Sequence, residues 1–168
     1  MQPGALLIGL LAAIAAAPAS AGPKPTPRLT ADGWGALRVG MPEADAIRRF
    51  HLRIEQAESE ECHALWSGDE RLMVLTTYGK VASVSVYRRP QVLTDRGLHI
   101  GSTEAEVRRA YGPALEIQPN HYDDPPAHYL TWWAKKGARG IMYETDPKGR
   151  VTGIHAGDET IGWTDGCG

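Results

Sequence analysis

The clearest pattern along the chain is the alternation of apolar and polar side chains in several short segments. Such alternation is typical of β-strands that bury one face and leave the other free. Gly79-Lys80 and Asp146-Pro147-Lys148-Gly149 are turn sequences that separate neighbouring segments and predict hairpins. The pattern predicts strands at residues 62–66, 71–78, 81–88, 128–134, 141–145 and 151–156.

Two further segments, residues 42–52 and 103–111, carry apolar side chains at the spacing of an amphipathic helix. Pro42 suits the first position of a helix, where its missing N–H costs nothing. Ser102 is expected to cap the second helix, and Gly112-Pro113 to end it. The apolar stripes are Ala46, Ile47 and Phe50 in the first helix and Val107, Ala110 and Tyr111 in the second.

The two predicted helices begin with related sequences. Residues 37–46 read Leu-Arg-Val-Gly-Met-Pro-Glu-Ala-Asp-Ala, and residues 98–107 read Leu-His-Ile-Gly-Ser-Thr-Glu-Ala-Glu-Val. Each helix is followed by three predicted strands, and such a unit cannot bury its apolar face alone. The predicted fold is therefore α+β: two tandem helix-plus-three-stranded antiparallel meander repeats, residues 33–92 and 93–168, form a sheet with helices on one face.

The repeated apolar-Gly-[Met/Ser]-[Pro/Thr]-Glu-Ala pattern resembles the unit of the BamE/SmpA-like outer-membrane-assembly lipoproteins. Its duplication resembles the β-lactamase inhibitor protein family, and the resemblance covers about residues 33–157. It implies one curved sheet and a protein that binds other proteins without catalysis. The ending Asp165-Gly166-Cys167 is also similar to the tails of an uncharacterised exported-protein family. The chain departs from these families because no Cys follows the predicted cleavage site and there is a single Cys pair.

The N-terminus has the layout of a secretory signal peptide. Residues 1–21 carry no charged side chain, include an apolar run over residues 5–17, and end in Ala19-Ser20-Ala21. The run is too short for a membrane span and is broken by Pro18. We expect cleavage near Ala21, a flexible leader at residues 22–32, and a periplasmic or secreted protein with no membrane anchor in its mature form.

Charge and cysteine content narrow the class further. The net charge of −2 gives no support for a nucleic-acid surface. Cys62 and Cys167 are the two cysteines of the chain, and in an oxidising compartment such a pair is expected to form a disulfide.

Aromatic side chains are predicted on the sheet face opposite the helices. The alternation places Tyr87, Tyr129, Trp133 and His155 there, and Tyr and Trp are common in binding hot spots. Either this face is open to a partner, or the Pro-rich loop or the C-terminal tail covers it. The predicted loop at residues 113–127, which contains His121 and Tyr122, is long enough to be an interaction loop.

The function expected from these features is that of a non-catalytic exported binding module, for protein–protein interaction or inhibitor-like. It would use the open sheet face and the 113–127 loop to hold another protein or an envelope component, with no cofactor. The alternative is a small exported hydrolase or metal-binding protein that uses His121, Asp124 and His155, although a zinc site needs three or four ligands. The sequence lacks Gly-x-Ser-x-Gly and His-Glu-x-x-His, and it gives no oligomeric state.

Overall fold

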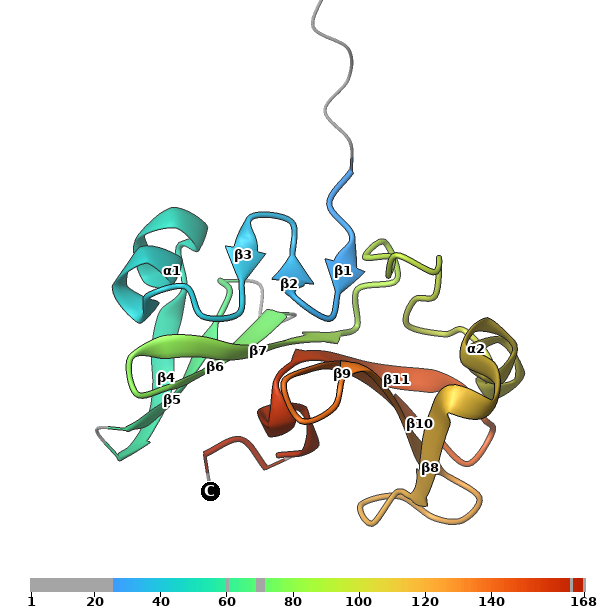
Figure 1. Cartoon of the computed structure of the whole chain (residues 1–168). Helices are drawn as coiled ribbons and strands as arrows, with labels where there is room; N and C mark the ends of the chain where they lie inside the picture. Colours follow the sequence, from blue (N-terminus) through green and yellow to red (C-terminus); the bar gives the residue numbers. More distant parts are fainter. Residues whose placement is uncertain (1–25, 60, 69–71, 164, 168) are drawn as a thin grey trace, which may run out of the picture.

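The computed structural model describes residues 26–59, 61–68, 72–163 and 165–167, so the predicted signal peptide lies outside the described residues. Its main element is an eight-stranded antiparallel sheet in the order β4-β5-β6-β7-β11-β10-β9-β8 (Figure 1). The strands are β4 (Arg53–Ser59), β5 (Cys62–Trp66), β6 (Leu72–Thr77), β7 (Lys80–Tyr87), β8 (Leu115–Pro119), β9 (His128–Lys135), β10 (Arg139–Thr145) and β11 (Val151–Gly157).

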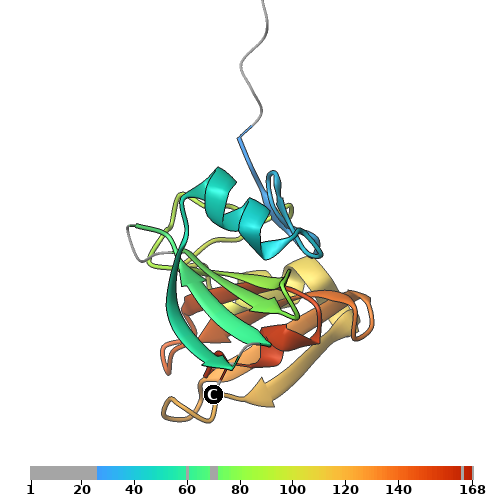
Figure 2. The same cartoon turned by 90° about the vertical axis from the view of Figure 1, so that its left-hand side faces the viewer.

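The smaller elements lie on the two faces of this sheet. The helices α1 (Glu43–Phe50) and α2 (Glu104–Tyr111) share one face with a small sheet of β1 (Leu29–Thr30), β2 (Gly33–Trp34) and β3 (Leu37–Arg38). The short helix η1 (Gly112–Ala114) follows α2. The opposite face, which we call the tail face, carries the short helix η2 (Glu159–Gly162) and the C-terminus (Figures 1 and 2).

The main core fills the space between the helices and the sheet. Four neighbouring strands, β7, β11, β10 and β9, each contribute fully buried side chains to it, among them Val84, Ile154, Tyr143 and Leu130. The Tyr143 hydroxyl is 2.8 Å from the hydroxyl of Tyr111, so the polar group of this large buried ring has a hydrogen-bond partner. Within the described ranges, neither α-helix is long and apolar enough to cross a membrane.

The start of α2 differs in detail from the prediction. Thr103, and not Ser102, is the N-cap: its hydroxyl accepts a hydrogen bond from the Glu106 N–H at 3.2 Å. The Glu106 carboxylate accepts in return from the Thr103 N–H at 2.7 Å, which completes a capping box. The Ser102 hydroxyl instead accepts from the backbone N–H of His99 at 3.0 Å.

The glutamate that begins each α-helix contacts a histidine of the sheet. Glu43 lies 2.8 Å from His63 Nδ1 on β5, and Glu104 lies 3.0 Å from His128 Nδ1 on β9. Burial alone would raise the pKa of Glu104, but its hydrogen bonds with His128 and Arg108 outweigh this and lower it. Both acids therefore hold a helix against the sheet, in addition to any interaction with the helix dipole.

The predicted fold class is wrong. The chain is built mostly of strands with two short α-helices among its described residues, and it forms an eight-stranded and a three-stranded sheet instead of two helix-plus-three-stranded meander repeats. The prediction missed β4 and β8, the outer strands of the main sheet. Arg53, Ile54 and Glu55 on β4 are all exposed, and so is β8 after Leu115, so these described stretches show no alternation of buried and exposed residues. Because β8 takes residues 115–119, the predicted 113–127 loop is shorter than expected.

Candidate functional site

The C-terminal segment covers the centre of the tail face. η2 packs against β7, β10 and β11, and the buried Ile161 lies in one apolar cluster with Tyr129 and Met142. Further along, Cys167 is joined to Cys62 of β5 by a disulfide with a Cα–Cα distance of 5.7 Å, as the pairing of the two cysteines predicts. The segment thus divides the tail face, and a pocket opens on each side of it.

The first of these, which we call the aromatic pocket, has a volume of about 320 Å³. It brings together four of the predicted site residues: His121 and Tyr122 from the loop after β8, and Tyr129 and Trp133 from β9. Its outer wall is β8, which pairs with β9, and its inner wall is η2. The continuous stretch from β8 to β9 and the distant tail therefore form this pocket together, and the tail takes part directly.

Trp133 lies across the neighbouring strand. Its partner on β10 is Gly140, where an added Cβ would come within 2.6 Å of the Trp133 ring. The Trp133 indole N–H donates to Glu116 of β8 at 3.3 Å, which fixes the ring in the pocket wall. The Lys136 ammonium pairs with Glu116 and lies 5.7 Å from the centre of the Trp133 ring.

The tail and the loop also hold each other in place. Tyr122, with 66% of its surface exposed, donates its hydroxyl hydrogen bond to Asp165 of the tail. On the pocket floor, the buried ring of Tyr129 lies 6.5 Å from the ring of exposed His121. The tail therefore positions the aromatic pocket through Ile161 and through Asp165.

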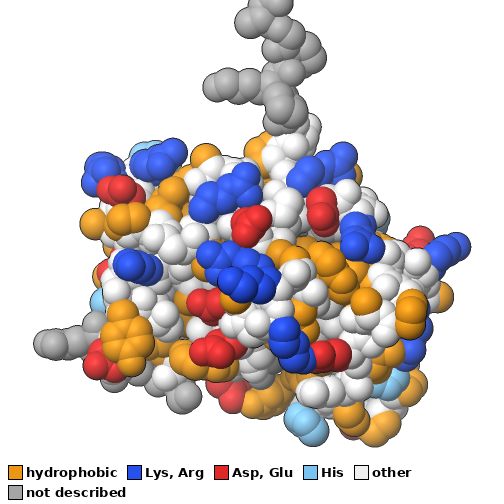
Figure 3. All heavy atoms as spheres, viewed as in Figure 1, with side chains coloured by type: hydrophobic (Ala, Val, Ile, Leu, Met, Phe, Trp, Pro, Cys, Tyr) orange, Lys and Arg blue, Asp and Glu red, His pale blue; other side chains and the backbone are white. Residues whose placement is uncertain are grey.

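The charge of the aromatic pocket is negative. Glu116 and Glu159 line it, and none of the described lining residues is Lys or Arg. A hydrogen bond from Lys136 lowers the pKa of Glu116, so this carboxylate stays ionised at neutral pH. Glu159 is exposed and has no ion-pair partner within the described part of the chain. In the view of Figure 3, by contrast, most Lys and Arg side chains lie over the half that carries the helices.

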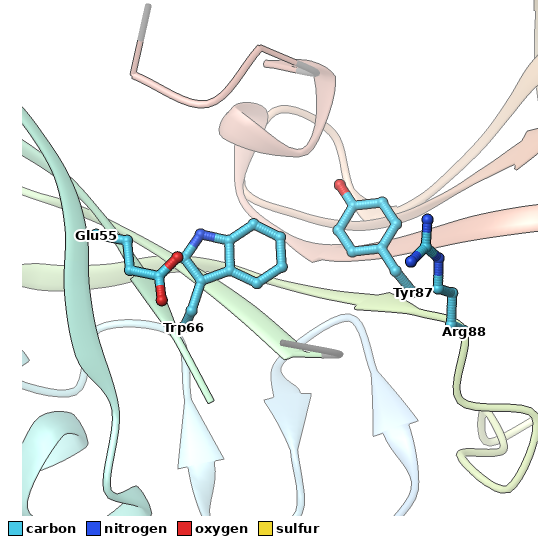
Figure 4. Close-up of a pocket in the computed structure, with 4 residues that line it drawn as sticks. All are labelled: Glu55, Trp66, Tyr87 and Arg88. Carbon is cyan, nitrogen blue, oxygen red and sulfur yellow. The ribbon is translucent and has the colours of Figure 1, made fainter. Parts of the chain in front are cut away.

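The second pocket has a volume of about 390 Å³ and is lined by Glu55, Trp66, Tyr87 and Arg88 (Figure 4). The rings of Trp66 and Tyr87 are nearly parallel, with centres 6.2 Å apart, and lie between the two charged side chains. Burial raises the pKa of Tyr87, so its phenol stays protonated. Tyr87 is thus on the predicted face but in a different pocket from Tyr129 and Trp133.

His155 lies on the tail face but is not exposed there, contrary to expectation. Only 3% of its surface is accessible, and its ring packs edge-on against Tyr87 at 5.5 Å between ring centres. His155 Nδ1 is 2.8 Å from the Ser85 hydroxyl, and Nε2 is 3.1 Å from a Glu144 oxygen without the geometry of a hydrogen bond. Gly153 provides the space, since a Cβ there would come within 2.6 Å of the other Glu144 oxygen.

The Ser85, His155 and Glu144 side chains have the residue types of a Ser–His–acid triad, and sequence reasoning did not find this group. The alternation did place Ser85 and His155 on one face, but no pattern singled out Glu144. Ser85 is 1% exposed, so a substrate cannot reach its hydroxyl, and we assign the group a structural role. Burial would raise the pKa of Glu144, but the contact with His155 outweighs it and the pKa is lowered.

The residues proposed for the metal or hydrolase alternative are not assembled into a site. His121 lines the aromatic pocket, Asp124 is exposed on the loop, and His155 is buried at the centre of the tail face. Across the described ranges, no group of three or more His, Cys, Asp or Glu side chains is arranged to hold a metal ion.

Comparison with known protein families, with curated proteins and with solved structures gave no match to this chain. The resemblance to the BamE/SmpA-like and β-lactamase inhibitor protein families stays a prediction.

Proposed function

We propose that the protein is an exported, non-catalytic binding module that holds another protein against its tail face. The observation that carries this proposal is the aromatic pocket. It gathers Tyr122, Tyr129 and Trp133 at a hollow with polar walls, and such aromatic side chains contribute most of the binding energy in many interfaces.

The construction of the pocket also favours binding over chemistry. Its Trp133 ring is fixed by Gly140 and Glu116, and its inner wall is fixed by the buried Ile161. A site whose side chains are already held in place loses little conformational entropy when a ligand binds. In the Ser85–His155–Glu144 group on the tail face, Ser85 and His155 are buried, and the group takes no part in the pocket.

Export is part of the same proposal. The charge-free N-terminal segment with its small residues at 19–21 supports a signal peptide cleaved near Ala21. The Cys62–Cys167 disulfide is compatible with an oxidising compartment. We therefore expect partners in the periplasm or outside the cell. Inhibition of such a partner is one form that the proposed binding would take.

The test is a selection from a random peptide display library on the immobilised, disulfide-bonded protein. We expect enriched peptides whose affinity falls by about 30-fold or more in Trp133→Ala, the loss typical of a hot-spot residue. Tyr78→Asn is the matched control, because Tyr78 is 75% exposed, lines neither pocket, and has a positive φ of 50° that Asn tolerates.

Two results would contradict the proposal. One is a selection that enriches no peptide, which would turn attention to glycans and other envelope components. The other is a set of peptides that bind Trp133→Ala as tightly as the wild type, which would place the binding surface elsewhere. Near-UV circular dichroism of each variant shows whether its fold is kept.

A further inference from the structure

The aromatic pocket combines two features that together select a ligand charge. Its aromatic rings come from β9 and the loop after β8, and its two carboxylates come from opposite walls, Glu116 from β8 and Glu159 from η2. The face of an aromatic ring attracts cations within about 6 Å of its centre. A pocket with such rings, two acids and no Lys or Arg among its described lining residues is complementary to a positive charge.

The protein already contains one example of this chemistry. The Lys136 ammonium lies 5.7 Å from the centre of the Trp133 ring and pairs with Glu116. The Lys136 side chain is 72% exposed and follows the end of β9, so little holds it in this position. Lys136 is therefore an internal cation that a ligand can displace.

We infer that the aromatic pocket is a receptor for the cationic side chain of a basic peptide segment, an Arg in preference to a Lys. This inference rests on the proposed function. The guanidinium would replace Lys136 beside Trp133 and Glu116 and would meet Glu159 on the inner wall. Arg fits better than Lys because its planar group stacks on aromatic rings and donates hydrogen bonds to two carboxylates at once.

The experiment titrates the disulfide-bonded protein with three capped peptides, acetyl-Gly-Arg-Gly-amide and its Lys and citrulline counterparts. The signal is the NMR shift of the Trp133 indole N–H, which reports directly on the pocket. Citrulline keeps the shape of Arg without its charge. We expect the Arg peptide to bind at least about tenfold more tightly than the citrulline peptide, and more tightly than the Lys peptide.

Two variants show whether the affinity depends on side chains at the pocket or only on the net charge of the protein. Glu159→Gln should weaken binding of the Arg peptide about 1.5-fold to fivefold, the usual range for an exposed ion pair. Lys136→Gln should tighten it by a similar factor, because the internal competitor is removed. The controls are Glu61→Gln and Lys148→Gln, which change the net charge equally at exposed positions that line neither pocket, and both should leave the affinity unchanged.

The outcomes distinguish this inference from the proposed function. Equal binding of the Arg and citrulline peptides, or equal effects of Lys136→Gln and Lys148→Gln, would overturn the inference. Display selection can still yield peptides that lack a basic residue and whose affinity depends on Trp133. In that case the proposed function stands and the inference about Arg does not. A selection that enriches nothing, together with no NMR shift by any peptide, would overturn both.

Discussion

Removing the disulfide gives the most direct test of how the tail stabilises the protein. The bridge joins Cys62 to Cys167 across 105 residues, and Cys62 is buried beside the side chains of Ala64 and Leu75. Closing a loop of this length removes conformational entropy from the unfolded chain, which in the loop-entropy model stabilises the fold by about 4–5 kcal/mol. The double variant Cys62→Ala/Cys167→Ala should lose that amount, because Ala keeps the buried position apolar.

The assay is urea unfolding at 25 °C, followed by tryptophan fluorescence and far-UV circular dichroism, on the oxidised wild type and the double variant. Since a single domain is typically stable by about 5–15 kcal/mol, the variant should unfold at a much lower urea concentration or be partly unfolded without urea. A loss below about 1 kcal/mol would refute the reasoning, because it would mean that the bridge does not restrict the unfolded chain. Wild type treated with a reductant should match the double variant.

Three further predictions concern the tail face. Ile161→Ala should cost about 2–5 kcal/mol in urea unfolding, because it empties a buried position under η2. Gly140→Ala should displace the Trp133 ring, cost about 1–3 kcal/mol and change the tryptophan fluorescence, because the new Cβ would come within 2.6 Å of that ring. Glu144→Gln should make stability less sensitive to acid in urea midpoints measured at pH 6, 4 and 3. Because folding lowers the pKa of Glu144, its carboxylate stabilises the fold above the unfolded-state pKa near 4.5. This stabilisation is lost as the pH falls through the folded-state pKa, and the Gln variant lacks it at every pH.

The strands that the sequence predicts are those that bury side chains on at least one face, and β6, β7, β10 and β11 are buried almost throughout. The β5 prediction has the observed bounds, and the predictions for β7, β9, β10 and β11 differ from them by one or two residues. The edge strands β4 and β8 were missed because the described side chains of residues 53–55 and 116–119 are exposed, and they are strands because each pairs with a neighbour that contributes to the core. Such pairing depends on the tertiary structure, and no local pattern reports it.

The site was predictable in its parts but not in its assembly. Alternation placed Tyr129 and Trp133 on one face, and loop composition singled out His121 and Tyr122. The inner wall was not predictable, because Glu159 reaches the pocket only through the path of the tail across the sheet. The sequence left open whether the aromatic face is free or covered by the tail. The structure shows both, since the tail covers the centre of the face and leaves a pocket on each side.

The position of the tail connects the disulfide to the aromatic pocket. Asp165, which accepts the hydrogen bond of Tyr122, lies close in sequence to the bridged Cys167, and Ile161 of the same segment packs with Tyr129. The outer wall belongs to the sheet, so only the inner wall and the loop depend on the bridge. Breaking the bridge should therefore weaken ligand binding even though neither cysteine lines the pocket, because the tail would have to be ordered again each time a ligand binds. Under the export proposed above, oxidation would complete the pocket in the compartment where the proposed partner is met.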